Sequence, residues 1–256
     1  MQAKLSEWNP ESLVPDVAST HISLLPKLVS SRIGKTLTVD SKECLNLATH
    51  NYLGLLQDER IVKSAISAAR KYGIGSCGPR GFYGTVDVHL DLEQRIAQFM
   101  KAEEAIVYSY GFSTVASAIS AYCKQRDIIF ADEKVNFAIQ KGFQASRSTI
   151  KYFKHNDVEH LENLLIEQTK FDDLNCKNTD NKSSKSSKKA RKFLIIEGIY
   201  MNTGMICRLP ELVALCEKYR VRIFIDESIS FGTIGDSGRG VTEYYGIPTY
   251  KIDMII

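Results

Sequence analysis

The hydrophobic positions of the first hundred residues recur at helical spacing in two segments. One stripe predicts a helix over about 60–72 and consists of Ile61, Val62, Ala65, Ile66 and Ala69. Gly73 follows this segment and suits its C-terminal cap. A second stripe predicts a helix over about 88–101 and consists of Leu92, Ile96, Phe99 and Met100. Residues 1–50 lack such a pattern and contain three scattered prolines, so we expect an extended N-terminal arm.

From residue 105 the pattern changes to short apolar runs that alternate with helical segments. We predict strands in AIVYSY from Ala105, DIIFAD from Asp127, IKYFKH from Ile150, KFLIIEG from Lys192, VRIFIDE from Val221 and DMII from Asp253. Asn156 with Glu159 forms a candidate capping box, and Pro210 marks another helix start. This alternation predicts an α/β fold with a mostly parallel sheet covered on both faces. Nothing follows DMII to cover it, so we expect a truncated form of a longer chain.

The positive charge of the chain is concentrated in one segment. The 256 residues carry a net charge of +3, and the hydrophobic fraction of 44 % excludes a disordered or collagen-like chain. Residues 175–192 hold seven basic residues against Asp180, so they contribute +6 and the remainder −3. Their composition predicts a Lys/Ser-rich surface insertion within a domain that extends over residues 51–256. The alternative is a basic patch for nuclear import or for binding anionic lipid. The mildly acidic remainder argues against a nucleic-acid partner.

Two further patterns bear on membrane insertion and metal binding. Residues 105–123 contain no charged residue, but their Ser, Thr and Gly content and the break at Gly111 favour a strand, a turn and a helix over a membrane span. The six cysteines include no CxxC pair and no metal-type spacing. The sequence therefore predicts neither a transmembrane segment nor a metal site.

Glycine and aspartate motifs indicate a ligand site at strand ends. Residues 73–78 match GxGxxG, but a helix precedes them and Pro79 follows, so the strand and helix of a dinucleotide site are missing. Gly111 and Phe112 instead open a predicted helix whose backbone amides can hold a phosphate. Asp226 ends an apolar strand, where ligands of parallel sheets bind, although a helix cap is the alternative. Together these features suggest pyridoxal phosphate (PLP), whose pyridine nitrogen an aspartate would keep protonated.

Several longer motifs resemble those of the α-oxoamine synthases, a family of PLP-dependent proteins of fold type I. The matching segments are NYLGL from Asn51, GPRGFYGTVDVHLDLE from Gly78, SYGF from Ser109, FKHND from Phe153, EGIYMNTG from Glu197 and DESISFGTIGDSGRG from Asp226. They extend over most of the chain. The resemblance implies the large domain of fold type I, with a mostly parallel sheet, truncated before the C-terminal small domain.

The chain departs from the family's catalytic pattern at positions that handle the cofactor. Catalytic members stack a His on the PLP ring where this chain has Asn136, and they carry a second His where it has Ile229. Their Schiff-base Lys is expected just beyond the last predicted strand, and Lys251 precedes that strand, on the wrong side to replace it. The resemblance thus implies no catalytic residue in this chain. It implies a vestigial or shared cofactor site at Gly111, Phe112, Asn136 and Asp226.

Within the family, the motifs CGPRGFYGT, EGIYMNTG and GRGVTEYYGI are similar to those of a non-catalytic subunit. This similarity implies a heterodimer, an acyltransferase whose catalytic subunit holds most of the PLP. That complex condenses L-serine with palmitoyl-CoA to 3-oxosphinganine, the first step of sphingolipid biosynthesis. The implied location is the cytosolic face of the endoplasmic reticulum membrane, with indirect association through the partner.

Two residues of the glycine-rich loop are candidates for the shared interface. Cys77 would line the partner's site and Arg80 would meet a substrate carboxylate or a CoA phosphate. A small buried thiol and a structural ion pair are the respective alternatives. Two other functions also stay open. One is a self-sufficient homodimer similar to aminolevulinate synthase, and the other is a ligand-free scaffold or regulatory protein.

Overall fold

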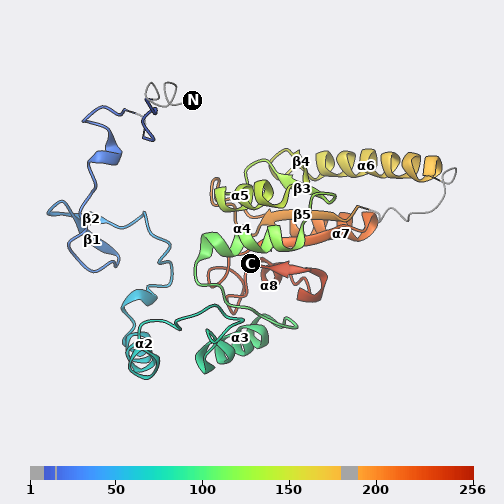
Figure 1. Cartoon of the computed structure of the whole chain (residues 1–256). Coiled ribbons are helices and arrows are strands. Elements are labelled where there is room, and N and C mark those ends of the chain that lie inside the picture. Colours follow the sequence, from blue (N-terminus) through green and yellow to red (C-terminus); the bar gives the residue numbers. More distant parts are fainter. Residues whose placement is uncertain (1–8, 15, 180–189) are drawn as a thin grey trace, which may run out of the picture. The chain divides into compact units, whose positions relative to one another are not determined.

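The structure is a computed structural model that describes residues 9–14, 16–179 and 190–256, with side chains of helix α6 described as far as residue 174. The chain divides into two compact units, Met1–Val62 and Lys63–Ile256. Figure 1 shows the elements of both.

The first unit contains an antiparallel hairpin of β1 (Thr36–Val39) and β2 (Lys42–Leu45), flanked by η1 (Ile22–Leu24) and η2 (Leu55–Gln57). Asp40 and Ser41 turn the hairpin with φ angles of 47° and 64°. Both angles lie in the left-handed region that a tight hairpin turn requires. This hairpin was not predicted from the sequence, because four-residue strands joined by Asp-Ser lack the Asn-Gly or Asp-Gly signal of such turns.

Two predicted helices are confirmed. Helix α2 (Glu59–Tyr72) ends at Gly73, which has a φ of 82° and donates its N–H to the carbonyl of Ala69 at 2.8 Å. This is the C-terminal cap that the glycine predicts. Helix α3 (Asp87–Met100) matches the second apolar stripe.

The second unit is built on a five-stranded parallel sheet with the order β4-β3-β5-β6-β7. The strands are β3 (Ile128–Asp132), β4 (Thr149–Phe153), β5 (Lys192–Glu197), β6 (Arg222–Asp226) and β7 (Met254–Ile255). The helices are α4 (Gly111–Tyr122), α5 (Phe137–Ser146), α6 (Val158–Thr179), α7 (Leu209–Tyr219) and α8 (Val241–Tyr244), with η3 (Thr249–Lys251) before β7. The predicted α/β class and five of the six predicted strands are confirmed.

Helices cover both faces of this sheet. Right-handed crossovers in this strand order place α5 on one face and α6 and α7 on the other. Helix α4 packs against α5, and α6 packs against α7 (Figure 1). Every residue of β3 and nearly every residue of β5 is buried. Since these central strands are covered twice, they are apolar runs without alternation.

Two local predictions were wrong. No strand forms from Ala105, where Ile106 is exposed, because an apolar run becomes a strand only where a neighbouring strand pairs with it. The capping box at Asn156 is replaced by Asp157, whose Oδ1 accepts the N–H of His160 at 2.9 Å. Helix α6 continues to Thr179, into the segment assigned to the insertion, and residues 180–189 of that insertion lie outside the described residues.

The uncharged stretch 105–123 folds as predicted in its second half, where helix α4 occupies Gly111–Tyr122. Among the described residues, no helix combines the length and the apolar character needed to cross a membrane.

Candidate functional site

Three carboxylates end three neighbouring strands of the parallel sheet. Asp132 is the last residue of β3, Glu197 of β5 and Asp226 of β6, and all three are buried. Parallel strands bring their carboxyl ends to one edge, which is where ligands bind in sheets of this kind. Glu197 and Asp226 are register partners across β5 and β6. The carboxylates therefore lie side by side at the edge that was predicted from Asp226 alone.

Asn136 joins two of these carboxylates to the start of helix α5. Its backbone N–H donates to Glu197 Oε1 at 2.8 Å, and its side-chain Nδ2 donates to Asp226 Oδ2 at 2.8 Å. Its Oδ1 accepts the N–H of Ile139 at 3.1 Å and so caps α5. Asn136 is 4 % exposed, so these contacts are made away from water. The structure thus brings together the predicted residues Asn136 and Asp226.

Burial raises the pKa of two glutamates at this edge of the sheet. Desolvation raises the pKa of Glu197 above its ordinary value, and hydrogen bonds donated by Met201 and Asn136 only partly oppose the rise. Desolvation likewise raises the pKa of Glu227, which accepts the Ser230 hydroxyl and the N–H of Val241. This edge of the sheet is therefore an environment that disfavours additional negative charge.

Gly111 and Phe112 lie at the first turn of α4, beside the start of α5. The Phe112 ring lies 5.8 Å from the ring of Phe137, the residue that follows Asn136. A Cβ added to Gly111 would meet no heavy atom within 4 Å, so there is open space at this helix start. The hydroxyls of Ser113 and Thr114 donate to the Tyr110 carbonyl. Backbone amides and open space at this helix start suit a phosphate group.

The two halves of a PLP site therefore differ in fit. The start of α4 suits the phosphate, but both oxygens of Asp226 already accept a hydrogen bond from this chain. Its Oδ2 accepts Nδ2 of Asn136, and its Oδ1 accepts the N–H of Ser228 at 2.9 Å. The described residues do not fit the cofactor in the manner that the family resemblance implies.

The remaining departures from the catalytic pattern also have defined places. Ile229 follows β6 in the loop toward α8, and its carbonyl accepts the Thr233 hydroxyl at 2.6 Å. Lys251 lies in η3, before β7, with its Nζ 2.8 Å from Glu217 of α7. The lysine is thus at the opposite end of β7 from the edge that carries Asp226.

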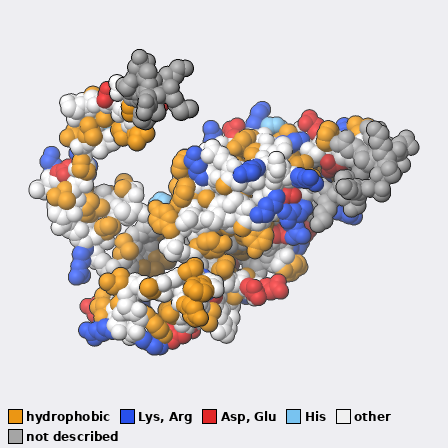
Figure 2. Space-filling model, in the orientation of Figure 1, with side chains coloured by type: hydrophobic (Ala, Val, Ile, Leu, Met, Phe, Trp, Pro, Cys, Tyr) orange, Lys and Arg blue, Asp and Glu red, His pale blue; other side chains and the backbone are white. Residues whose placement is uncertain are grey.

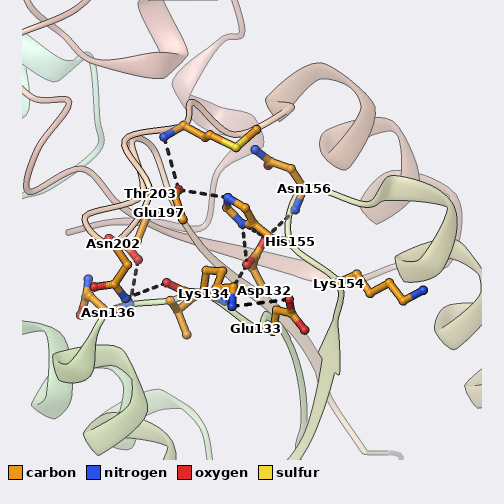
Figure 3. A network of polar contacts seen from close by, with 12 residues as sticks. Asp132, Glu133, Lys134, Asn136, Lys154, His155, Asn156, Glu197, Asn202 and Thr203 are labelled. Atoms are coloured by element: carbon orange, nitrogen blue, oxygen red, sulfur yellow. Dashed lines mark hydrogen bonds and ion pairs between the residues drawn. The ribbon is translucent and has the colours of Figure 1, made fainter.

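A second polar network at the same edge surrounds Asp132 (Figure 3). Asp132 accepts Nδ1–H of His155 at 2.9 Å and the N–H groups of Lys134 and Asn156, each at 2.8 Å. Because the carboxylate can only accept, His155 carries a proton on Nδ1, and its Nε2 lies 3.0 Å from the Thr203 hydroxyl. The network ties together the loops that follow β3, β4 and β5.

Neither this network nor the hydrogen bond from the Asn136 backbone to Glu197 was predicted from the sequence. One signal was available, since Asp132 and Glu197 also end apolar strands and could have been selected by the rule that selected Asp226. The partners of His155 could not be found in this way, because Thr203 is 48 residues away along the chain.

Arg80 and Cys77 lie in the loop between α2 and α3. The Arg80 guanidinium donates to both oxygens of Glu93, at 2.8 and 2.9 Å, and to Thr85 Oγ1 at 2.9 Å. This pairing lowers the pKa of Glu93, whose Oε1 also accepts the N–H of Val107. Cys77 is exposed and has a φ of 57°. The structure thus places Arg80 in an ion pair within this chain. It leaves the Cys77 thiol exposed and not buried.

Known proteins resemble this chain in both sequence and structure. A family model described as aminotransferase class I and II matches residues 42–244. The chain is 48 % identical over 97 % of its length to Long chain base biosynthesis protein 1c of Oryza sativa subsp. japonica. It is 44 % identical over 98 % of its length to Serine palmitoyltransferase 1 of Dictyostelium discoideum. The chain spans about half the length of these relatives, 49 % and 50 % respectively.

Solved structures confirm the fold that the motifs imply. A serine palmitoyltransferase variant from S. paucimobilis with a bound PLP–myriocin aldimine superposes with a TM-score of 0.78 and 27 % identity, over 90 % of this chain and 54 % of the other. Sphingomonas wittichii serine palmitoyltransferase gives a TM-score of 0.78 and 26 % identity, over 90 % and 53 %. Since the family model matches most of the sequence, from β2 to α8, the chain belongs to the aminotransferase class I and II family.

Proposed function

We propose that this chain is a non-catalytic subunit of serine palmitoyltransferase. In this role it supports the condensation of L-serine with palmitoyl-CoA to 3-oxosphinganine by a partner subunit that holds most of the PLP. One observation carries the proposal: Asn136 stands where catalytic relatives have a stacking His, and its amide is bonded to Asp226. A chain whose cofactor aspartate is already paired would leave the reaction to its partner.

The relatives support the substrate class. The curated proteins named for long chain base biosynthesis and serine palmitoyltransferase 1 align with nearly the whole of this chain. Two structural neighbours are serine palmitoyltransferases, and one of them holds a PLP–myriocin aldimine. The alternative of a self-sufficient homodimer is less compatible with Asn136 and Ile229, since neither side chain can stack as an aromatic base or transfer a proton.

The surface of the second unit supports association with another protein. Hydrophobic side chains are numerous on the face shown in Figure 2. Six large ones between the end of α2 and the start of α4 are each more than half exposed: Ile74, Phe82, Tyr83, Leu90, Ile106 and Tyr110. Exposed apolar residues in such numbers are typical of interaction surfaces. Gly111 and Phe112 lie directly beside this segment, so a partner there would adjoin the phosphate-binding end of α4. In this proposal Cys77 and Arg80 belong to the same shared region.

The proposed location is the cytosolic face of the endoplasmic reticulum membrane. It follows from the proposed role in sphingolipid synthesis, whose acyl-CoA substrate and product are lipids. The described residues contain no helix suited to cross a membrane, so the contribution of this part of the chain to membrane association would be through its partner.

Co-expression tests the proposal directly. The chain, carrying an affinity tag, is produced with a PLP-bearing catalytic homologue, and CoA release is measured with L-serine and palmitoyl-CoA. We expect co-purification, activity of the complex, and no activity of the chain alone. Replacing the partner's Schiff-base lysine should abolish activity, whereas the matched variant Lys251→Ala in this chain should leave it unchanged.

Two results would contradict the proposal. Activity of the chain alone, with an absorbance band of lysine-bound PLP, would establish the homodimer instead. Failure to associate with any PLP-bearing homologue would favour the alternative of a ligand-free scaffold or regulatory protein.

A further inference from the structure

We infer that the Asn136 side chain closes this chain's own copy of the cofactor site, by occupying on Asp226 the place of a pyridine N–H. Asp226 is then a buried structural anchor for Asn136 and not a ligand-binding group. The inference concerns the residues of this chain and does not depend on the proposed partner.

The orientation of the Asn136 amide is dictated by its neighbours. An N–H of α5 can only donate, so the atom that meets Ile139 must be the oxygen. A carboxylate oxygen can only accept, so the atom that meets Asp226 must be the nitrogen. Both contacts require the same orientation of the Asn136 side-chain amide, and the flipped orientation would lose both hydrogen bonds.

The amide reproduces the chemistry of the group that it would replace. A protonated pyridine nitrogen offers one N–H to a carboxylate, and Nδ2 of Asn136 offers the same at 2.8 Å. The second oxygen of Asp226 accepts the Ser228 N–H at 2.9 Å. Asp226 is 3 % exposed, so this carboxylate is satisfied by protein donors and not by solvent.

Asn136 is also held too firmly to swing aside. Its backbone N–H is bonded to Glu197 of β5, its Oδ1 to α5 and its Nδ2 to Asp226 at the end of β6. Moving the side chain away from Asp226 would uncap α5 and leave a buried carboxylate with one donor fewer. A ligand that needs Asp226 must therefore displace a side chain held by two hydrogen bonds, one to α5 and one to Asp226 itself.

The test uses pyridoxamine 5′-phosphate, which has the ring nitrogen and the phosphate of PLP but no aldehyde to react with lysines. Binding to the 256-residue chain is measured by calorimetry for the parent and for Asn136→Ser. Serine retains a good N-cap for α5 but is too short to reach Asp226. We expect no saturable binding by the parent, saturable binding by Asn136→Ser, and loss of that binding when Asp226→Asn is added.

Asn202→Ser is the matched control, since Asn202 bonds to the Lys134 carbonyl in a neighbouring loop and not to Asp226. It should behave as the parent. Equal binding by the parent and Asn136→Ser, or binding that survives Asp226→Asn, would overturn the inference. Absence of binding by a folded Asn136→Ser would overturn it too, because something else would then close the site.

The parent chain supplies a second measurement in case Asn136→Ser unfolds, as judged by circular dichroism. Saturable binding of pyridoxamine 5′-phosphate to the parent that is lost in Asp226→Asn contradicts the closure directly. In the parent, the side-chain amide protons of Asn136 should exchange slowly with water and should not respond to the ligand. All of these readouts are made without a partner, so failure of the proposed heterodimer would not affect them.

Discussion

Glu197 and Asp226 lie opposite each other at the ends of the parallel strands β5 and β6, both buried. Two adjacent carboxylates away from water repel each other and lose solvation. The neutral Asn136 donates one hydrogen bond to each of them, from its backbone and from its side chain. This arrangement stabilises the sheet edge without adding a charge, and it makes the edge sensitive to substitution of one residue.

Asn136→Asp should destabilise the chain strongly at neutral pH. Aspartate can still cap α5, but it removes the donor to Asp226 and adds a third buried carboxylate. We expect a loss of about 3–5 kcal/mol in the free energy of unfolding at pH 7, measured by urea denaturation. The loss should shrink as the pH falls toward 5, because protonation relieves the repulsion. Asn136→Ser, which adds no charge, should lose only about 1–3 kcal/mol at both pH values.

Glu197→Gln should change the shape of the stability–pH curve. Burial raises the pKa of Glu197 in the folded chain above the 4.5 of an exposed glutamate. Between the unfolded and the folded pKa, Glu197 therefore holds a proton in the folded state that it has released in the unfolded state. This contribution is fully present below the unfolded pKa and is lost as the pH rises through the folded one. Urea midpoints measured from pH 4 to 8 should fall less steeply with pH for Glu197→Gln than for the parent. Parallel curves would show that Glu197 does not titrate in this way.

Glu243→Gln should act on the acid side with the opposite sign. Glu243 accepts hydrogen bonds from Ser237 and Arg239, which hold its pKa at about 2. Its stabilising contribution is present above the unfolded pKa of 4.5 and is lost as the pH falls toward 2. The variant should unfold at lower urea than the parent at pH 7, and the difference should vanish near pH 2. A difference that is constant with pH would contradict the assignment.

Gly142→Ala should destabilise the chain although alanine favours helices. A Cβ at Gly142 would lie 2.9 Å from Ile119 Cβ and Cδ1, where α5 packs on α4. We expect a net loss of about 1–3 kcal/mol in the free energy of unfolding. Ile119→Val removes one of the two clashing atoms, so the double variant should lose less than the sum of the single variants. Gly111→Ala meets no atom within 4 Å and is the control, expected to be neutral or slightly stabilising.

A double-mutant cycle should separate a structural role of Arg80 from a substrate-binding one. Arg80 donates both arms of its guanidinium to Glu93, which also holds the Val107 N–H. Arg80→Ala and Glu93→Gln should therefore show a coupling free energy larger than that of the exposed pair Lys71–Asp87. In the proposed complex, Arg80→Lys should change the urea midpoint and leave the KM for palmitoyl-CoA unchanged. A raised KM with unchanged stability would assign Arg80 to the substrate.

Most of the sheet could be predicted from the sequence because its central strands are covered on both faces. Such strands must be apolar throughout, and this is why DIIFAD, KFLIIEG and VRIFIDE are recognisable without a structure. AIVYSY has the same composition but no strand beside it, and pairing is not visible in a single segment. Asn156 likewise resembles an N-cap in the sequence, but its φ of 54° places it in a turn before the helix.

The candidate site likewise has some features that were predictable from the sequence and others that depend on tertiary contacts. Asp226 and the start of α4 were identified from the sequence, because strand ends and helix starts are local features with local signals. The bond between Asn136 and Asp226 joins residues 90 positions apart. Only the folding of β3, β5 and β6 into one sheet brings them within hydrogen-bonding distance. The sequence by itself determined the α/β class, the positions of the strands and which residues depart from the catalytic pattern. The tertiary structure decided what Asn136 does, because hydrogen bonds between distant segments exist only once the sheet has set their register.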